Sequence, residues 1–73
     1  MQYRIRYLTG TDKLRVDNLM EFAGDSEATQ YVTDVAKETN DDPAVVSVDI
    51  ADSVYLAMKI NGEVRAGFIK GVQ

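Results

Sequence analysis

The stretch Lys59-Ile60-Asn61-Gly62-Glu63-Val64-Arg65 joins two segments rich in β-forming residues and decides how the last third of the chain folds. Asn-Gly between two such segments is the strongest short-range signal for a β-hairpin. A shift of one residue in the pairing turns every side chain of a strand to the other face of the sheet. The type of turn therefore determines which side chains face solvent.

Two pairings fit this hairpin. A two-residue turn at Asn61-Gly62 pairs Ile60 with Glu63 and sets charged side chains among aliphatic ones. A three-residue loop with Gly62 in a bulge instead pairs Lys59 with Glu63, which carry opposite charges. This bulged register also gathers one apolar face, made of Val54, Leu56, Met58, Val64, Ala66 and Phe68. We expect the bulged register because charge and hydrophobic pattern agree in it, with the two-residue turn as the alternative.

The remaining sequence predicts two strands, a helix and a further strand before the hairpin. Period-two alternation indicates strands at residues 3–8 and 14–22, and β-branched residues indicate another at 44–50. Between them, apolar residues at helical spacing predict one amphipathic helix, with the stripe Ala28, Tyr31, Val32, Val35 and Ala36. Asp25 and Ser26 are its candidate N-cap residues, and the helix should end near Thr39.

These elements predict an α+β fold with the order β-β-α-β-β-β, in which one helix packs on one face of a five-stranded, mostly antiparallel sheet. We expect one small domain over residues 1–73 and a strand order 2-1-3-4-5. In the alternative, a split β-α-β unit, the third strand runs parallel to the second.

The composition argues against most enzyme chemistries. The 73 residues contain no cysteine and no histidine, which removes the commonest nucleophile partner, general base and metal ligands. Asp49 and Asp52 flank a predicted turn, where nothing would raise a carboxyl pKa, and Asp41-Asp42 lacks the spacing of a calcium loop. We expect no catalytic residues, no cofactor site and no metal site.

Charge is unevenly distributed along the chain and suggests two candidate surfaces. Residues 17–52 carry ten acidic residues against Lys37 alone, whereas both flanking segments are basic. The bulged register predicts a partner-binding sheet face with Arg4, Arg6, Arg15, Tyr55 and Arg65. An alternative acidic surface along the helix and its exit comprises Glu27, Asp34, Glu38, Asp41 and Asp42.

We therefore expect a small, non-catalytic binding or regulatory module that acts through contacts with a protein partner. A nucleic acid on the basic sheet face is one alternative, although a pI near 4.5 is far from the usual basic footprint. In a second alternative, the acidic surface acts on a basic partner as an inhibitor or as a mimic of a nucleic acid. The strand edges of so thin a sheet leave room for homodimerisation through an edge or the open face. Without a membrane span or signal-peptide layout, we expect a cytoplasmic protein.

Overall fold

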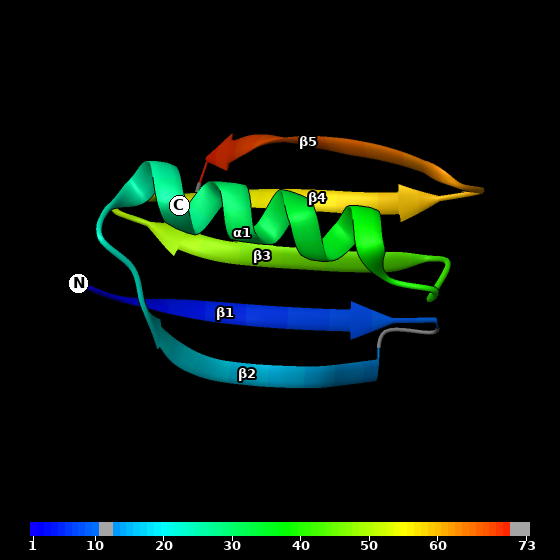
Figure 1. Cartoon of the computed structure of the whole chain (residues 1–73), viewed down its shortest axis with the longest axis horizontal. Helices are drawn as coiled ribbons and strands as arrows, with labels where there is room; N and C mark the ends of the chain where they lie inside the picture. The colour runs from blue at the N-terminus through cyan, green and yellow to red at the C-terminus, as the bar shows by residue number, and fades with distance from the viewer. Residues whose placement is uncertain (11–12, 71–73) are drawn as a thin grey trace.

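Five antiparallel strands form one sheet, and one helix lies across a single face of it (Figure 1). The computed structural model describes the backbone of residues 1–10 and 13–70 and the side chains of residues 1–10 and 16–69. Its elements are β1 (Gln2–Thr9), β2 (Lys13–Glu21), α1 (Asp25–Glu38), β3 (Ala44–Ile50), β4 (Ser53–Ile60) and β5 (Glu63–Lys70). The predicted α+β class and element order are confirmed.

The strand order is β2-β1-β3-β4-β5, as expected. β3 runs antiparallel to β1, and β2 also runs antiparallel to β1. β2 and β3 are therefore parallel to each other with β1 between them. The two arrangements that the sequence left open are thus one and the same topology.

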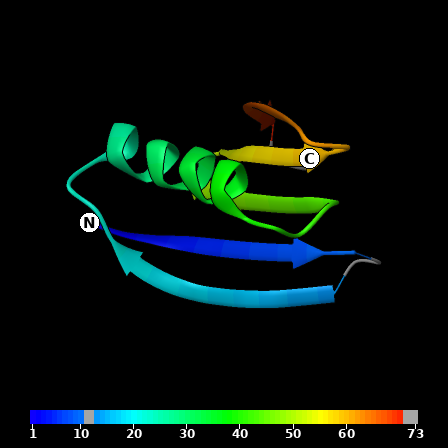
Figure 2. The same cartoon turned by 45° about the vertical axis from the view of Figure 1, so that its right-hand side comes forward.

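The helix contacts mainly β3 and β4, so that β1 and β2 extend beyond it on the same face (Figure 2). Ala28, Val32 and Ala36 of α1 are fully buried against the sheet. Small residues at two of these three positions let the helix axis approach the strands closely. Below them lie the buried side chains of the sheet, which include Tyr3, Ile5, Val46, Val48 and Ala57.

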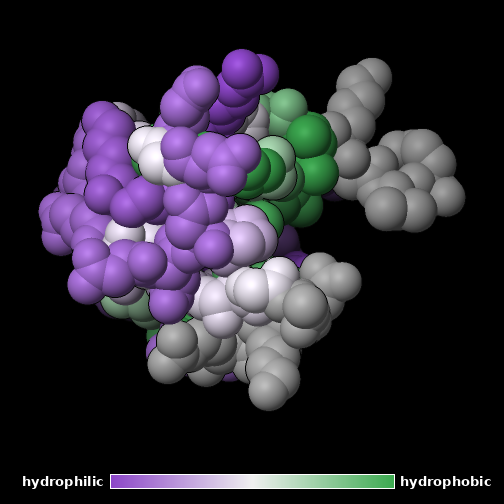
Figure 3. Space-filling view, turned by 90° about the vertical axis from the view of Figure 1, so that its right-hand side faces the viewer, coloured by the Kyte–Doolittle hydropathy of each residue, from purple (hydrophilic) through white to green (hydrophobic). Residues whose placement is uncertain are grey.

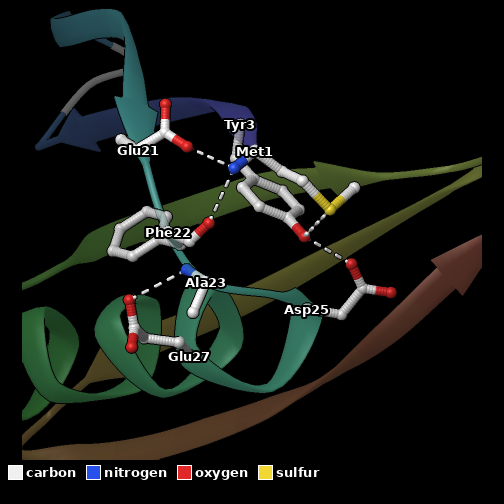
Figure 4. A network of polar contacts seen from close by, with 7 residues as sticks. All are labelled: Met1, Tyr3, Glu21, Phe22, Ala23, Asp25 and Glu27. Carbon is white, nitrogen blue, oxygen red and sulfur yellow. Dashed lines mark hydrogen bonds and ion pairs between the residues drawn. The ribbon is translucent and has the colours of Figure 1, made fainter.

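The start of α1 is held by contacts other than the predicted caps (Figure 4). Gly24 is the N-cap, and no side chain bonds to the first helical N–H groups. Glu27 reaches back to the N–H of Ala23 at 3.1 Å, which places its charge at the positive end of the helix. Asp25, expected as a cap, instead accepts a hydrogen bond from the hydroxyl of Tyr3, with 2.7 Å between the two oxygens. This hydrogen bond, with burial and the nearby negative charge, raises the pKa of Tyr3.

The end of α1 is fixed by two strands. Lys59 of β4 donates from Nζ to the carbonyl of Thr39, the C-cap residue, at 2.5 Å. A cation is favoured there because the last carbonyls of a helix carry partial negative charge. Tyr7 of β1 bonds through its hydroxyl to the side chains of Thr39 and Asp41. The exit of the helix is thereby tied to β1 and β4.

The hairpin between β4 and β5 adopts the two-residue turn, so the bulged register is wrong. Ile60 pairs with Glu63, and Tyr55 pairs with Phe68. Asn61 and Gly62 have φ values of 53° and 81°, the left-handed conformation that a two-residue hairpin turn requires. The physical reason lies outside the hairpin, because Asp42 accepts the backbone N–H groups of both turn residues.

Candidate interaction surface

The sheet face that the helix leaves bare, called here the open face, divides into a polar and an apolar half. The alternation of each strand and the pairing register place the outward side chains there. The polar half consists of Arg4, Arg6, Asp17 and Asp49, with the exposed Leu19 opposite Arg4, over β1, β2 and one end of β3. The apolar half extends from β1 to β5 and comprises Leu8, Val45, Val54, Leu56, Met58, Ile60 and Ile69.

The apolar half results directly from the two-residue turn. Val54 pairs with Ile69, and Met58 of β4 pairs with Val45 of β3, all on the open face. Ile60 and Ile69 remain 47% and 51% exposed. Figure 3 views the end of the molecule that carries the β4–β5 turn, with hydrophilic residues on the helix side and hydrophobic ones toward the open face. The bulged register would have placed Val54, Leu56 and Met58 of β4 under the helix instead.

A shallow groove of about 300 Å³ lies at the turn end of the apolar half, lined by Met58, Ile60, Asn61, Glu63 and Arg65. The last two side chains are exposed and carry opposite charges. The groove therefore combines an apolar floor with one cation and one anion at its rim. Arg65, a member of the predicted partner-binding set, borders the apolar half at this groove.

The polar half is held by two arginine–carboxylate pairs. Arg4 binds both oxygens of Asp17, through Nε and Nη2, each at 2.8 Å. Arg6 donates from Nη2 to both carboxylate oxygens of Asp49, at 3.1 Å to Oδ1 and 2.9 Å to Oδ2. Because the pairs are diagonal on neighbouring strands, positive and negative side chains alternate across the surface. Two cross-strand ion pairs therefore link β1 to its neighbours β2 and β3 on this face.

The Arg4–Asp17 pair also shifts the titration of its members. The hydrogen bonds from Arg4 lower the pKa of Asp17, and the same bonds raise the pKa of Arg4. Arg6 adds to the shift of Asp17 through its charge. The Nε of Arg6 itself is buried, and no hydrogen-bond partner reaches it from the described residues. The polar half is therefore a neutralised network rather than a free basic patch.

Tyr55 does not lie on the open face, because the tight turn places it on the helix side. Its hydroxyl shares a hydrogen bond with Thr33 of α1 at 3.1 Å, and its ring meets Phe68 edge to face at 4.9 Å. Lys59, also expected on the open face, bonds to Thr39 under the helix. The side chain of Arg15 lies outside the described residues. The structure therefore brings Arg4, Arg6 and Arg65 to the open face without the aromatic residue.

The predicted acidic surface separates into parts with different contacts. Glu27 and Asp34 line an open groove of about 870 Å³ beside the helix, together with Phe22 and Tyr31. Asp34 accepts a hydrogen bond from Gln30, and Glu38 is exposed. Asp41 and Asp42 instead bond to Tyr7 and to the β4–β5 turn. These two loop acids hold the fold together, a role that sequence reasoning missed.

Within the described residues, no group of three or more acidic side chains is arranged to hold a metal ion. None of the helices in that part of the chain is long and apolar enough to cross a membrane. Comparisons with protein-family models, curated proteins and solved structures each return no match for the chain.

Proposed function

We propose that this chain is a non-catalytic binding module whose open sheet face contacts another protein. The observation that carries the proposal is the apolar half, where aliphatic side chains from neighbouring strands adjoin one another and no described element covers them. Exposed single aliphatic residues are ordinary on protein surfaces, whereas a contiguous apolar area of several hundred Å² commonly marks an interaction site.

The size of the open face suits such a contact. Strands lie about 4.8 Å apart and rise about 3.3 Å per residue, so a five-stranded sheet of this length presents roughly 600 Å² on one face. A partner that covered it would bury roughly 1,200 Å² in total, the lower end of specific protein–protein interfaces. Burial of the apolar half supplies the driving force, and the neutralised polar half can remain at a hydrated rim.

The alternatives receive less support from the observed contacts. A nucleic acid would need free cations and exposed aromatic rings on the open face, but Arg4 and Arg6 are paired and Tyr55 lies under the helix. A protein that mimics a nucleic acid would use the predicted acidic surface along α1. Asp42 of that surface is instead hydrogen-bonded to the β4–β5 turn. We extend the proposal to a cytoplasmic location, which fractionation of the native host tests.

The proposal is tested by comparing two charge-matched double variants. Leu56→Lys with Ile69→Lys introduces two cations into the apolar half, whereas Ser26→Lys with Gln30→Lys introduces two on the exposed side of the helix. Partners cross-linked in the native host are identified by mass spectrometry, and circular dichroism verifies the fold of each variant.

We expect the open-face variant to lose at least one partner that the parent and the helix variant both retain. An unchanged set of cross-linked partners would refute the role of the open face. Turnover of a small molecule in a metabolite screen would refute the non-catalytic part of the proposal.

A further inference from the structure

β5 is an edge strand that exposes large apolar side chains on both faces of the sheet. It pairs only with β4, so its other edge has no neighbouring strand in the described chain. Phe68 on the helix side is 59% exposed, and Ile69 on the open face is 51% exposed. The run from Ala66 to Ile69 contains no charge and no proline, the features that usually protect an edge strand from pairing.

Only one kind of contact covers Phe68 and Ile69 together. A protein docked on the open face would reach Ile69 alone, and one docked beside the helix would reach Phe68 alone. A strand added along the edge places new side chains next to both, because its own residues alternate between the two faces. The exposure of consecutive residues on opposite faces therefore points to strand addition.

The opposite edge of the sheet is built differently. β2 also exposes apolar residues, Val16 at 38% and Leu19 at 62%. Asp17 and Asn18 separate them, and Asp17 is engaged in the ion pair with Arg4. The pairing of β2 with β1 is also irregular next to Leu8, and such irregularities and charges discourage further pairing. The two edges thus differ, and β5 is the unprotected one.

We propose that β5 pairs antiparallel with β5 of a second copy of this chain, which joins two sheets into one of ten strands. A two-fold axis perpendicular to the sheet keeps helix side with helix side and open face with open face. With the axis at Gly67, Phe68 of each copy lies opposite Ala66 of the other. A large ring then faces a small residue on both sides of the axis.

The same alignment is favourable on the open face. Ile69 of one copy lies opposite Arg65 of the other, whose aliphatic stem can cover it while the guanidinium reaches solvent. The two copies of Arg65 lie at opposite ends of the paired segment, so like charges do not meet. Gly67 has open space around it, with no atom within 4 Å of where a Cβ would lie. No side chain therefore crowds the open face at the axis.

This pairing uses the strand edge and leaves the open face accessible. It therefore goes beyond the proposed function and does not depend on it. The two open faces would lie on the same side of the joined sheet, with Arg65 and Ile69 of both copies at the junction.

Sedimentation equilibrium of the parent chain and two matched variants tests the pairing. We expect the parent to sediment at twice 8.1 kDa at micromolar concentration. Phe68→Lys should sediment as a monomer, because a charge at the centre of the edge opposes pairing. Leu19→Lys, an equally exposed apolar position on the other edge strand, should remain dimeric. A parent chain that is monomeric throughout the micromolar range overturns the proposal.

Amide hydrogen exchange of the parent chain distinguishes the edge from other dimer contacts without any substitution. In a two-residue turn the N–H of Glu63 points to β4, and the ladder then alternates, so the amides of Val64, Ala66 and Phe68 point outward. We expect these three amides to be protected at high protein concentration and to exchange faster on dilution. A dimer in which they exchange freely at every concentration overturns the proposal. Protection that requires another protein overturns it equally.

Discussion

The carboxylate of Asp42 accepts the backbone N–H of Gly62 at 2.7 Å, and its other oxygen accepts that of Asn61 at 2.9 Å. The acid belongs to the loop after α1, whereas the turn lies nineteen residues further along the chain. Both N–H groups point away from the hairpin, where otherwise only water could bond them. Asp42 therefore stabilises the two-residue turn, and with it the composition of the open face.

Replacement of Asp42 by alanine should destabilise the chain by about 1 kcal/mol, since it removes two charge-assisted hydrogen bonds at an exposed site. Urea denaturation followed by circular dichroism measures the change. Glu38→Ala is the control, because that carboxylate is exposed on the helix and has no bond to the turn. Equal stability of both variants would show that Asp42 does not hold the turn.

Gly62→Ala should cost about 1–2 kcal/mol, because an L-residue at a φ of 81° crowds its own backbone. The space around a Cβ at Gly62 is empty, so the cost is one of backbone conformation alone. Gly67→Ala, in the strand that follows the turn, is the matched control. Its Cβ also meets open space, and its φ lies outside the left-handed range, so its unfolding free energy should stay unchanged or rise. The two thermal unfolding midpoints must differ for the turn assignment to hold.

The two neighbouring valines of β3 should respond differently to truncation. Val46 is fully buried beneath α1, so Val46→Ala removes two buried methyl groups and should cost about 2 kcal/mol. Val45 is half-buried on the open face, and Val45→Ala should cost clearly less. Denaturant midpoints at constant m-value compare the two. A larger loss at Val45 would contradict the assignment of the faces.

Asp17→Asn should reduce stability at neutral pH and have no effect in strong acid. The pKa of Asp17 is lowered in the folded chain from its ordinary value of about 3.8, chiefly by the hydrogen bonds from Arg4. Its stabilisation is therefore complete above that ordinary value and is lost as the pH falls through the folded pKa. The difference in unfolding free energy between parent and variant, measured from pH 7 to pH 2, should decline only below about pH 4. A difference that stays constant over this range would show that the ion pair does not stabilise the fold.

Local patterns were sufficient to predict the elements and their order. The apolar stripe of α1, from Ala28 to Ala36, and the alternation in β1 each reflect burial against a single layer, which sequence periodicity reports directly. The helix caps were predicted incorrectly, because Asp25 is engaged by Tyr3 from the first strand. Propensity at one position does not reveal such a distant partner.

The register of the last hairpin depended on contacts with residues outside the hairpin. A comparison of residue pairs within the hairpin does not include them. The bulged alternative gained a Lys59–Glu63 pair, but Lys59 instead binds the carbonyl of Thr39 at the end of the helix. Asp42 then favours the tight turn by bonding to Asn61 and Gly62. Both contacts join segments far apart in the sequence, so hydrophobic pattern alone led to the wrong face for Val54 and Tyr55 of β4.

The alternating charges of Arg4, Arg6, Asp17 and Asp49 also have a kinetic consequence. Opposite charges so close together cancel within a few ångströms, so a protein approaching the open face meets little long-range electric field. Association there should proceed at the rate of an unsteered encounter, about 10⁵–10⁶ M⁻¹s⁻¹, and should change little with added salt. Affinity at this surface would then be set by how slowly the complex comes apart.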